Sequence, residues 1–243
     1  ADSASKVAAP AAKPKNDKVV PAMTTYLHGE DLLKKLQAGG LVLFTRHFHT
    51  DHSEIHEDKT RHHKKNLNDA YFKDCKMQRP LSDYGRLQAS TMGKAVAALD
   101  IKLGRVVSSP YCRTMEGSEL ITGHKPEVQT ELIYRKIDFS VAMANAHVIE
   151  HLQSKPAPGT NVLLMGHRPP MDNLDRIWEG ESFIFEPRAD GKYDLVGRVR
   201  AEGWSLATVD IRYLGAAVHR RSKYRSDGLW IETYRDYPVN AFK

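Results

Sequence analysis

Two short apolar runs constrain the fold of this chain more than any other feature. Residues 41–44 (LVLF) and 161–165 (NVLLM) do not alternate with polar residues, which is typical of strands that are covered on both faces. A helical pattern of apolar residues precedes each run, at 28–40 and at 141–152. The repeated alternation of helix and strand predicts an α/β fold, a three-layer α/β/α sandwich with a mostly parallel central sheet.

Local signals predict the other elements of the domain. Ser82 is placed to cap a helix whose apolar residues Ala89, Met92, Val96 and Leu99 share one face. Further strand segments are expected at 105–108, in a hairpin of 181–187 with 192–200, and at 204–211.

Composition divides the chain into a leader and one domain. Residues 1–22 are small, proline-bearing and lysine-rich, which predicts a flexible leader. Residues 23–243 have the length of a single domain. Two parts of that domain are not assigned: a polar, histidine-rich insertion at about 48–79 and a basic and aromatic tail at about 212–243.

The start of the chain is typical of a protein from which a secretory signal peptide has been cleaved, because Ala1 is followed by small residues. We therefore expect a periplasmic or secreted protein. The two cysteines, Cys75 and Cys112, are compatible with one disulfide in an oxidising compartment and equally with two free thiols.

The charge balance favours anionic partners. The sequence has 36 Lys and Arg against 30 Asp and Glu, a formal net charge of +6. The charges are scattered and no zinc-finger, RRM, KH or helix-turn-helix signature is present, so we expect no nucleic-acid partner. The apolar runs reach about 4 to 6 residues, against the roughly 18 to 20 that a membrane helix needs. A phosphorylated small molecule is the expected partner, and the oligomeric state is open.

Cationic and imidazole side chains follow three of the predicted strands, in TRHFHT, SSPYCRT and GHRPP. Because parallel strands end at one edge of a sheet, we expect these segments to converge. Arg46 and Arg113 predict a phosphoryl pocket, since guanidinium groups match phosphate oxygens and stay charged. His47 is the expected nucleophile, because imidazole attacks when neutral and nearby arginines disfavour its protonated form.

These motifs resemble those of the histidine phosphatase superfamily, the phosphoglycerate-mutase-like or RHG-motif enzymes. TRHFHT matches the Arg-His-Gly signature, and RPLSDYGRLQA matches a Leu-Ser-x-x-Gly-Arg-x-Gln-Ala segment. SSPYCRT matches Ser-Ser-Pro-x-x-Arg-Thr, and the GH before RPP matches a late histidine. The resemblance covers roughly residues 38–210 and is strongest to small exported members. It implies a phosphoglycerate-mutase-like fold and phosphomonoester hydrolysis through a phosphohistidine intermediate.

The resemblance also implies roles for single residues. His47 is implied as the phosphorylated nucleophile, with Arg46 and Arg113 as phosphate ligands. His167 is implied as a further phosphate-binding and transition-state group. The resemblance places two more residues near the phosphate, Thr50 and Ser53.

The chain departs from the family pattern in three places. Phe48 replaces the glycine that commonly follows the nucleophile, so a bulky ring must be housed there. Residues 115–117 read MEG where Glu-Thr-Ala is usual, and Lys136 stands where many members keep a glutamate proton donor. A general acid contributes about 10²- to 10⁴-fold, so its loss would slow catalysis without abolishing phosphate binding.

Three carboxylates near the pocket are candidates for the missing acid. Asp138 is the first choice, because a shift of two residues from Lys136 preserves a strand face. Asp172 and Glu131 are the others. If none of them donates the proton, the alternative to a phosphatase is a non-catalytic or weakly active anion-binding member of the superfamily.

Six of the twelve histidines lie between His47 and His63. The segment contains no HExxH and no finger-like array of cysteine and histidine, so we interpret it as a solvated basic loop and expect no metal. Superfamily members need no cofactor, and we expect none. Specificity should come from residues 48–79 and from the loops around Tyr134 and Asp172. Within the insertion, Phe48, Tyr71 and Phe72 either rim the entrance or pack in the core.

Overall fold

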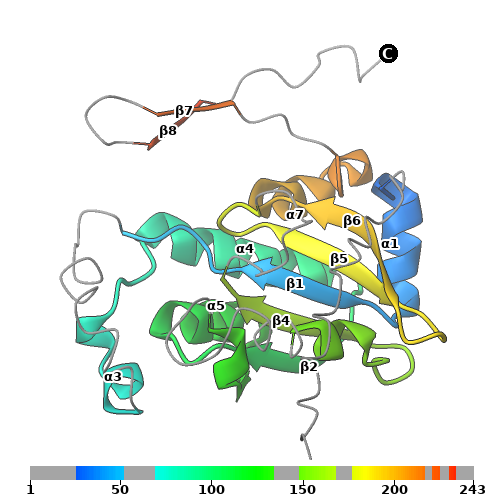
Figure 1. The fold of residues 1–243 in the computed structure, drawn as a ribbon. Coiled ribbons are helices and arrows are strands. Elements are labelled where there is room, and N and C mark those ends of the chain that lie inside the picture. The colour runs from blue at the N-terminus through cyan, green and yellow to red at the C-terminus, as the bar shows by residue number, and fades with distance from the viewer. Residues whose placement is uncertain are drawn as a thin grey trace, which may run out of the picture.

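A mixed sheet of six strands organises the fold (Figure 1). The computed structural model describes residues 26–51, 69–133, 148–167, 177–216, 221–224 and 230–233. The strands of the sheet follow the order β3-β2-β4-β1-β5-β6. They are β1 Val42–Arg46, β2 Leu103–Ser108, β3 Glu127–Val128, β4 Asn161–Gly166, β5 Ser182–Pro187 and β6 Tyr193–Val199.

The four strands β3, β2, β4 and β1 are mutually parallel. Strand β5 pairs antiparallel with β1, and β6 pairs antiparallel with β5, so the predicted hairpin extends one edge of the sheet. The strand expected at 105–108 begins earlier, at Leu103. The predicted α/β fold with a mostly parallel sheet is confirmed.

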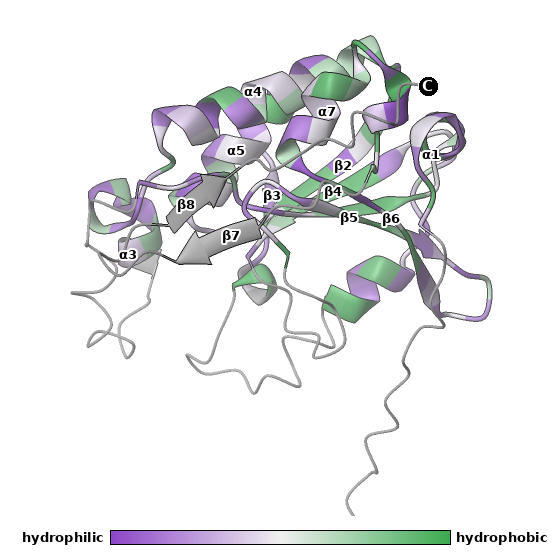
Figure 2. Ribbon diagram, turned by 90° about the horizontal axis from the view of Figure 1, so that it is seen from above, coloured by the Kyte–Doolittle hydropathy of each residue, from purple (hydrophilic) through white to green (hydrophobic). Residues whose placement is uncertain are grey.

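Helices flank this sheet. The described helices are α1 Gly29–Ala38, α3 Asp69–Lys73, α4 Asp83–Ala98, α5 Cys112–Thr122 and α7 Ala201–Ala207, with the 3-10 helices η2 Cys75–Met77, η3 Thr130–Leu132 and η4 Ile211–Tyr213, and α3 lies away from the sheet (Figure 1). Leu43 of β1 lies in a buried cluster with residues of α1, α4 and α7, and Figure 2 shows these helices on one side of the sheet. Phe44 points to the opposite face, where its cluster includes Val148 and Leu152 of a helical segment. The core therefore has two halves, one on each face.

Helix α4 begins where the sequence predicts. Ser82 is its N-cap, and the Ser82 hydroxyl accepts a hydrogen bond from the amide of Gly85 at 3.0 Å. The segment after β1 passes very close to this turn, because a Cβ atom on Gly85 would lie 2.0 Å from the carbonyl oxygen of His49. The Nδ1 atom of His49 is also 2.7 Å from the Ser82 hydroxyl. The first turn of α4 thus fixes the backbone that follows His47.

The prediction of a strand at 204–211 is wrong. Residues Ala201–Ala207 form helix α7, and Ala201, Trp204 and Ala207 are all buried. These three residues recur three apart, which is the spacing of one helix face. Trp204 is fully buried in the same cluster as residues of α1 and α4. The segment is helical because burial of this helix face outweighs the local preference of a short segment for a strand.

The two unassigned segments contain regular structure. Within 48–79, the chain forms α3 and η2, and within 212–243, strands β7 Arg221–Tyr224 and β8 Trp230–Thr233 pair as a separate hairpin. The leader predicted at 1–22 lies outside the described residues, as does the first part of the helix predicted at 141–152.

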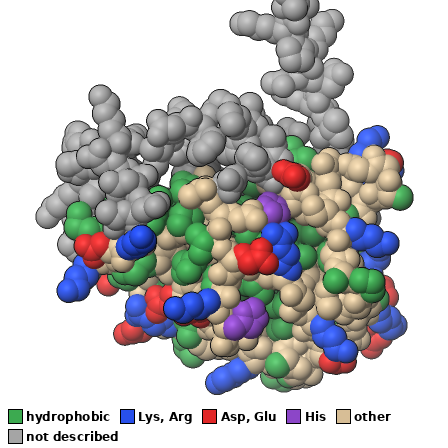
Figure 3. Space-filling model, turned by 90° about the horizontal axis from the view of Figure 1, so that it is seen from below, with side chains coloured by type: hydrophobic (Ala, Val, Ile, Leu, Met, Phe, Trp, Pro, Cys, Tyr) green, Lys and Arg blue, Asp and Glu red, His purple; other side chains and the backbone are tan. Residues whose placement is uncertain are grey.

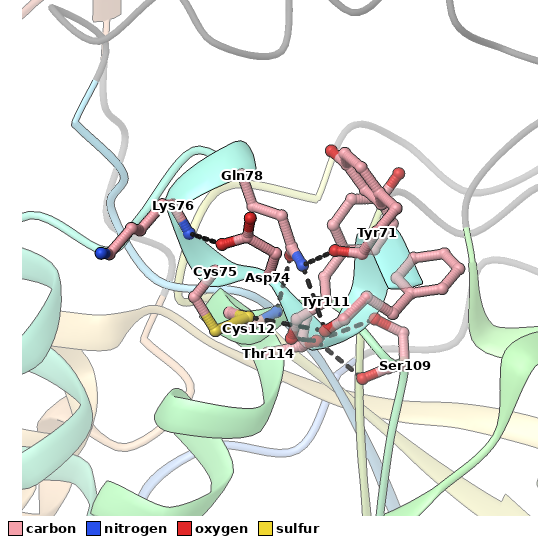
Figure 4. The surroundings of a disulfide bond; sticks show 10 residues. Tyr71, Asp74, Cys75, Lys76, Gln78, Ser109, Tyr111, Cys112 and Thr114 are labelled. Carbon is pink, nitrogen blue, oxygen red and sulfur yellow. Dashed lines mark hydrogen bonds between the residues drawn. A yellow bond between two sulfur atoms is a disulfide. The ribbon is translucent and has the colours of Figure 1, made fainter. Parts of the chain in front are cut away.

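Cys75 and Cys112 form a disulfide, one of the two alternatives that the sequence leaves open. The bond joins η2 to the first residue of α5, across a sequence separation of 37 residues (Figure 4). Gln78 ties the same parts of the chain together: its Oε1 atom accepts a hydrogen bond from the amide of Cys112 at 2.9 Å, and its Nε2 donates to the Tyr71 carbonyl at 3.0 Å. Part of the insertion is therefore fastened to the start of α5.

Phe48 lies in the core and does not rim an entrance, since its side chain is fully buried. Two glycines give its ring room. A Cβ atom on Gly117 would lie 3.3 Å from Cδ2 of Phe48, and one on Gly180 would lie 2.9 Å from its Cδ1. Gly117 and Gly180 therefore leave the space that the ring of Phe48 occupies.

Among the described helices, none is both long and apolar enough to cross a membrane.

On the face shown in Figure 3, Lys and Arg side chains are interspersed with Asp and Glu. This face therefore presents both signs of charge.

Candidate active site

The parallel sheet brings three predicted site segments together at one edge. Arg46 at the end of β1 lies opposite Gly166 of β4, and Ser108 at the end of β2 lies opposite Met165. Two backbone hydrogen bonds continue this register beyond the strands. The amide of His47 donates to the Gly166 carbonyl at 2.9 Å, and the amide of Ser109 donates to the Met165 carbonyl at 3.0 Å.

Two imidazole rings occupy the centre of this edge. The rings of His47 and His167 are 5.3 Å apart between centroids and inclined by 62°. Both side chains are nearly inaccessible, with 3% of His47 and 6% of His167 exposed. Arg113, from the first turn of α5, is also buried, and its Nη2 donates to Nδ1 of His167 at 3.3 Å. The structure thus places His47 and Arg113, two of the predicted site residues, beside a third, His167.

The hydrogen bonds of His167 define its tautomer. Arginine only donates, so Nδ1 of His167 accepts and its hydrogen is on Nε2. That Nε2 atom donates to the Ser109 hydroxyl at 2.9 Å. The Ser109 hydroxyl is 2.8 Å from that of Thr114, which in turn donates to the Tyr111 carbonyl at 2.7 Å. This chain of bonds holds the His167 ring and the Arg113 guanidinium in one orientation.

His47 has the opposite tautomer. Its Nδ1 atom lies 2.9 Å from the carbonyl oxygen of Phe48. A carbonyl oxygen only accepts, so Nδ1 carries the hydrogen and the lone pair of the neutral ring is on Nε2. Nε2 of His47 is therefore the ring nitrogen with an available lone pair.

Burial is the largest of the effects that hold the pKa of His47 well below 6.5, and the charges of Arg113 and Arg46 lower it further. The Phe48 carbonyl acts against them. Burial likewise leads the effects that lower the pKa of His167, followed by Arg113, Arg46 and Arg79. Both imidazoles are therefore neutral at physiological pH, as a nitrogen nucleophile requires.

Arg46 is held by the segment that leads into β5. Its Nη1 donates to the Ile177 carbonyl at 3.1 Å and its Nη2 to Oε1 of Glu179 at 3.0 Å. The second carboxylate oxygen of Glu179 accepts from the amide of Thr50 at 3.4 Å. Both side chains of the ion pair are 14% exposed, so it is only weakly screened by solvent.

Glu179 is a site residue that sequence reasoning missed. It lies beside β1 because β5 pairs antiparallel with that strand, with Thr45 opposite Ser182. The amide of Gly180 continues this contact and donates to the His47 carbonyl at 3.0 Å. The hairpin was predicted, but its place next to β1 was not, and only that pairing brings Glu179 to Arg46.

Arg79 is the second residue that sequence reasoning missed. Its charge acts on His167, which places a third guanidinium on the His167 side of the site. The string QRPLS was visible in the sequence, but no role was assigned to its arginine. Arg79 follows Gln78, the residue that fastens the insertion to α5.

The other predicted site residues are placed in part. Thr50 is fully buried, and a β-bridge pairs it with Leu81. Four positions discussed for the site lie outside the described residues: Ser53, Lys136, Asp138 and Asp172. The described residues contain no group of three or more His, Cys, Asp or Glu side chains able to hold a metal ion. Most of the histidine-rich segment lies outside them.

The chain is similar to several solved structures. The protein histidine phosphatase SixA in complex with tungstate matches with 16% identity and a TM-score of 0.46, over 66% of this chain and 97% of that chain. Phosphoserine phosphatase from Entamoeba histolytica matches with 12% identity and a TM-score of 0.43, over 65% and 95% of the two chains. Phosphoglycerate mutase from Bacillus anthracis matches with 14% identity and a TM-score of 0.43, over 72% and 99%.

No family model and no curated protein matches the chain. The structural neighbours are members of the histidine phosphatase superfamily, the group that the sequence motifs resemble. The likeness concerns the fold, and the chemistry of the site depends on its own residues.

Proposed function

We propose that this chain is a phosphomonoester hydrolase that acts through a phosphohistidine intermediate on His47. The observation that carries the proposal is the pair of buried, neutral imidazoles with Arg113 and Arg46 beside them. Arginine side chains in a buried site bind a phosphoryl dianion strongly and stabilise the charge that develops on its oxygens. The neutral ring of His47 supplies the nucleophile.

The reaction has two displacement steps. The lone pair on Nε2 of His47 forms a bond to phosphorus while the bond from phosphorus to the ester oxygen breaks, and the departing oxygen takes up a proton. A water molecule then attacks the phosphorus and gives a proton back to the group that protonated the departing oxygen, while the nitrogen–phosphorus bond breaks and its electron pair returns to Nε2. Inorganic phosphate leaves, and His47 is neutral again.

The source of the proton distinguishes the two candidate functions. Lys136 stands at the position where the resemblance places the acid, and we keep Asp138 as the first substitute. If no group donates a proton, the chain is a weakly active or non-catalytic anion-binding protein. Because p-nitrophenolate leaves without help, hydrolysis of p-nitrophenyl phosphate tests the nucleophile separately from the acid.

The experiment compares His47→Ala with His124→Ala, a change at an exposed histidine of the α5–β3 connection. We expect the first variant to lose hydrolysis of p-nitrophenyl phosphate and the second to keep it. Denaturation during turnover should trap phosphate on the protein in an acid-labile, base-stable form. Tungstate binding without turnover by the unmodified protein would favour the anion-binding function.

We further propose that the protein works in an oxidising compartment, the periplasm or the extracellular space. The disulfide between Cys75 and Cys112 supports this proposal, because such bonds are rare where thiols are kept reduced. Thiol alkylation of freshly lysed producing cells, followed by mass spectrometry, tests it. Alkylated Cys75 and Cys112 in the folded protein would contradict export.

A further inference from the structure

Three aromatic rings stand beside the candidate phosphoryl pocket. Tyr71 and Phe72 of α3 are 5.5 Å apart between ring centroids, and they lie 6.2 Å and 5.3 Å from the ring of Tyr111. Tyr111 in turn lies 4.8 Å from the ring of His167, and the guanidinium of Arg113 stacks 4.4 Å above it. The three rings therefore continue directly from His167 and Arg113, two residues of the proposed phosphoryl pocket.

Tyr71, Phe72 and Tyr111 are partly exposed, and hydrogen bonds to the backbone help to fix the position of the first two. Gln78 is 1% exposed, and its Nε2 donates to the backbone carbonyls of Tyr71 and Phe72 at 3.0 Å and 3.3 Å. Its Oε1 accepts from the amide of Cys112, which also carries the disulfide (Figure 4). The aromatic wall is therefore preorganised on α5, the helix that carries Arg113.

We infer that Tyr71, Phe72 and Tyr111 bind the leaving group, and that the substrate is an aryl phosphate, a phosphomonoester whose ring is attached directly to the ester oxygen. This inference rests on the proposed function and names its substrate class. Aromatic rings pack well edge to face against other rings. The wall begins at Tyr111, one ring away from His167, so it suits a ring bonded to the ester oxygen.

The chemistry at position 136 agrees with this substrate class. A phenol has a pKa of about 10, well below that of water or of a simple alcohol. A phenolate therefore departs with less help from an acid than an alkoxide does. An aryl phosphatase tolerates Lys136 in place of a glutamate far better than a phosphatase of alkyl esters.

Binding to the His47→Ala variant tests the inference without turnover. O-phosphotyrosine and O-phosphoserine are compared by calorimetry, both as free amino acids and within one short peptide sequence. The two forms distinguish a free aryl phosphate from a phosphorylated protein side chain as the source. We expect the tyrosine compound to bind about two- to tenfold more tightly per engaged ring, in at least one form.

Tyr71→Leu and Phe72→Leu in the same background should each reduce this preference, because they remove a ring and leave the backbone bonds to Gln78 in place. Tyr26→Leu is the matched control at an exposed tyrosine before α1. Equal binding of the two compounds, or a preference that survives both substitutions, overturns the inference. A retained binding preference, with neither compound hydrolysed by the unmodified protein, instead counts against the proposed hydrolysis and leaves the inference standing.

Discussion

Reduction of the disulfide should destabilise the whole domain. The bond closes a loop of 37 residues that includes α4 and β2, both of which contribute to the core. For a loop of that length, loop-closure entropy predicts about 4 kcal/mol of stabilisation. In a chain of this size, about 1 kcal/mol shifts the melting temperature by about 2 to 4 °C, so the Cys75→Ser/Cys112→Ser variant should melt about 8 to 16 °C lower.

Circular dichroism during heating, with and without a reductant, measures this shift. The unmodified protein should lose stability when the reductant is added. The double serine variant should be unaffected by it, which separates loss of the bond from any other effect of the reagent. A melting temperature that changes by less than about 2 °C in both comparisons would refute the argument, because it would mean that Gln78 and the surrounding packing hold the two segments together without the bond.

Further predictions concern pH, the core and the ion pair. Because burial and the arginines hold the pKa of His47 well below 6.5, kcat on p-nitrophenyl phosphate should not fall between about pH 7.5 and 6.5; a titration near 6.5 would contradict a buried nucleophile. The unfolded chain binds protons that the folded His47 and His167 do not, so stability should be full above about pH 6.5 and decline below it, as urea unfolding at each pH will measure. Phe48→Ala should cost about 3 to 5 kcal/mol by the same assay, and Gly117→Ala should be tolerated better in that variant than in the unmodified protein. Glu179→Gln should tighten tungstate binding, because it keeps an acceptor for the arginine and removes a negative charge, whereas Glu179→Ala should weaken it; the same change in both would refute this role.

Much of the site could be predicted from the sequence because its residues follow parallel strands. His47, Arg113 and His167 each follow a strand, and parallel strands end at one edge, so order along the chain was enough to bring them together. Glu179 was missed because its position depends on which strand the hairpin pairs with. Arg79 was missed because the disulfide and Gln78 decide where its segment lies, and the sequence does not show whether the two cysteines are bonded.

The packing of Phe48 against Gly117 illustrates a different limit of prediction from sequence. Each departure from the family pattern is visible in the sequence, but the contact between them is a property of the folded core. Helix α7 was mistaken for a strand for a related reason, since the burial of Trp204 is decided by packing and not by local preference.

The charges around the two histidines match the charge of the proposed substrate. Arg46, Arg79 and Arg113 all lower the pKa of His167, and Glu179 is paired with one of them, so these four groups sum to +2. A phosphate monoester carries about −1.5 to −2 at neutral pH. If both imidazoles were protonated, the sum over these groups and the two rings would be +4, and the nucleophile proposed at His47 would be lost. Burial prevents this by keeping both rings neutral, and Glu179 limits the excess of positive charge while it orients Arg46.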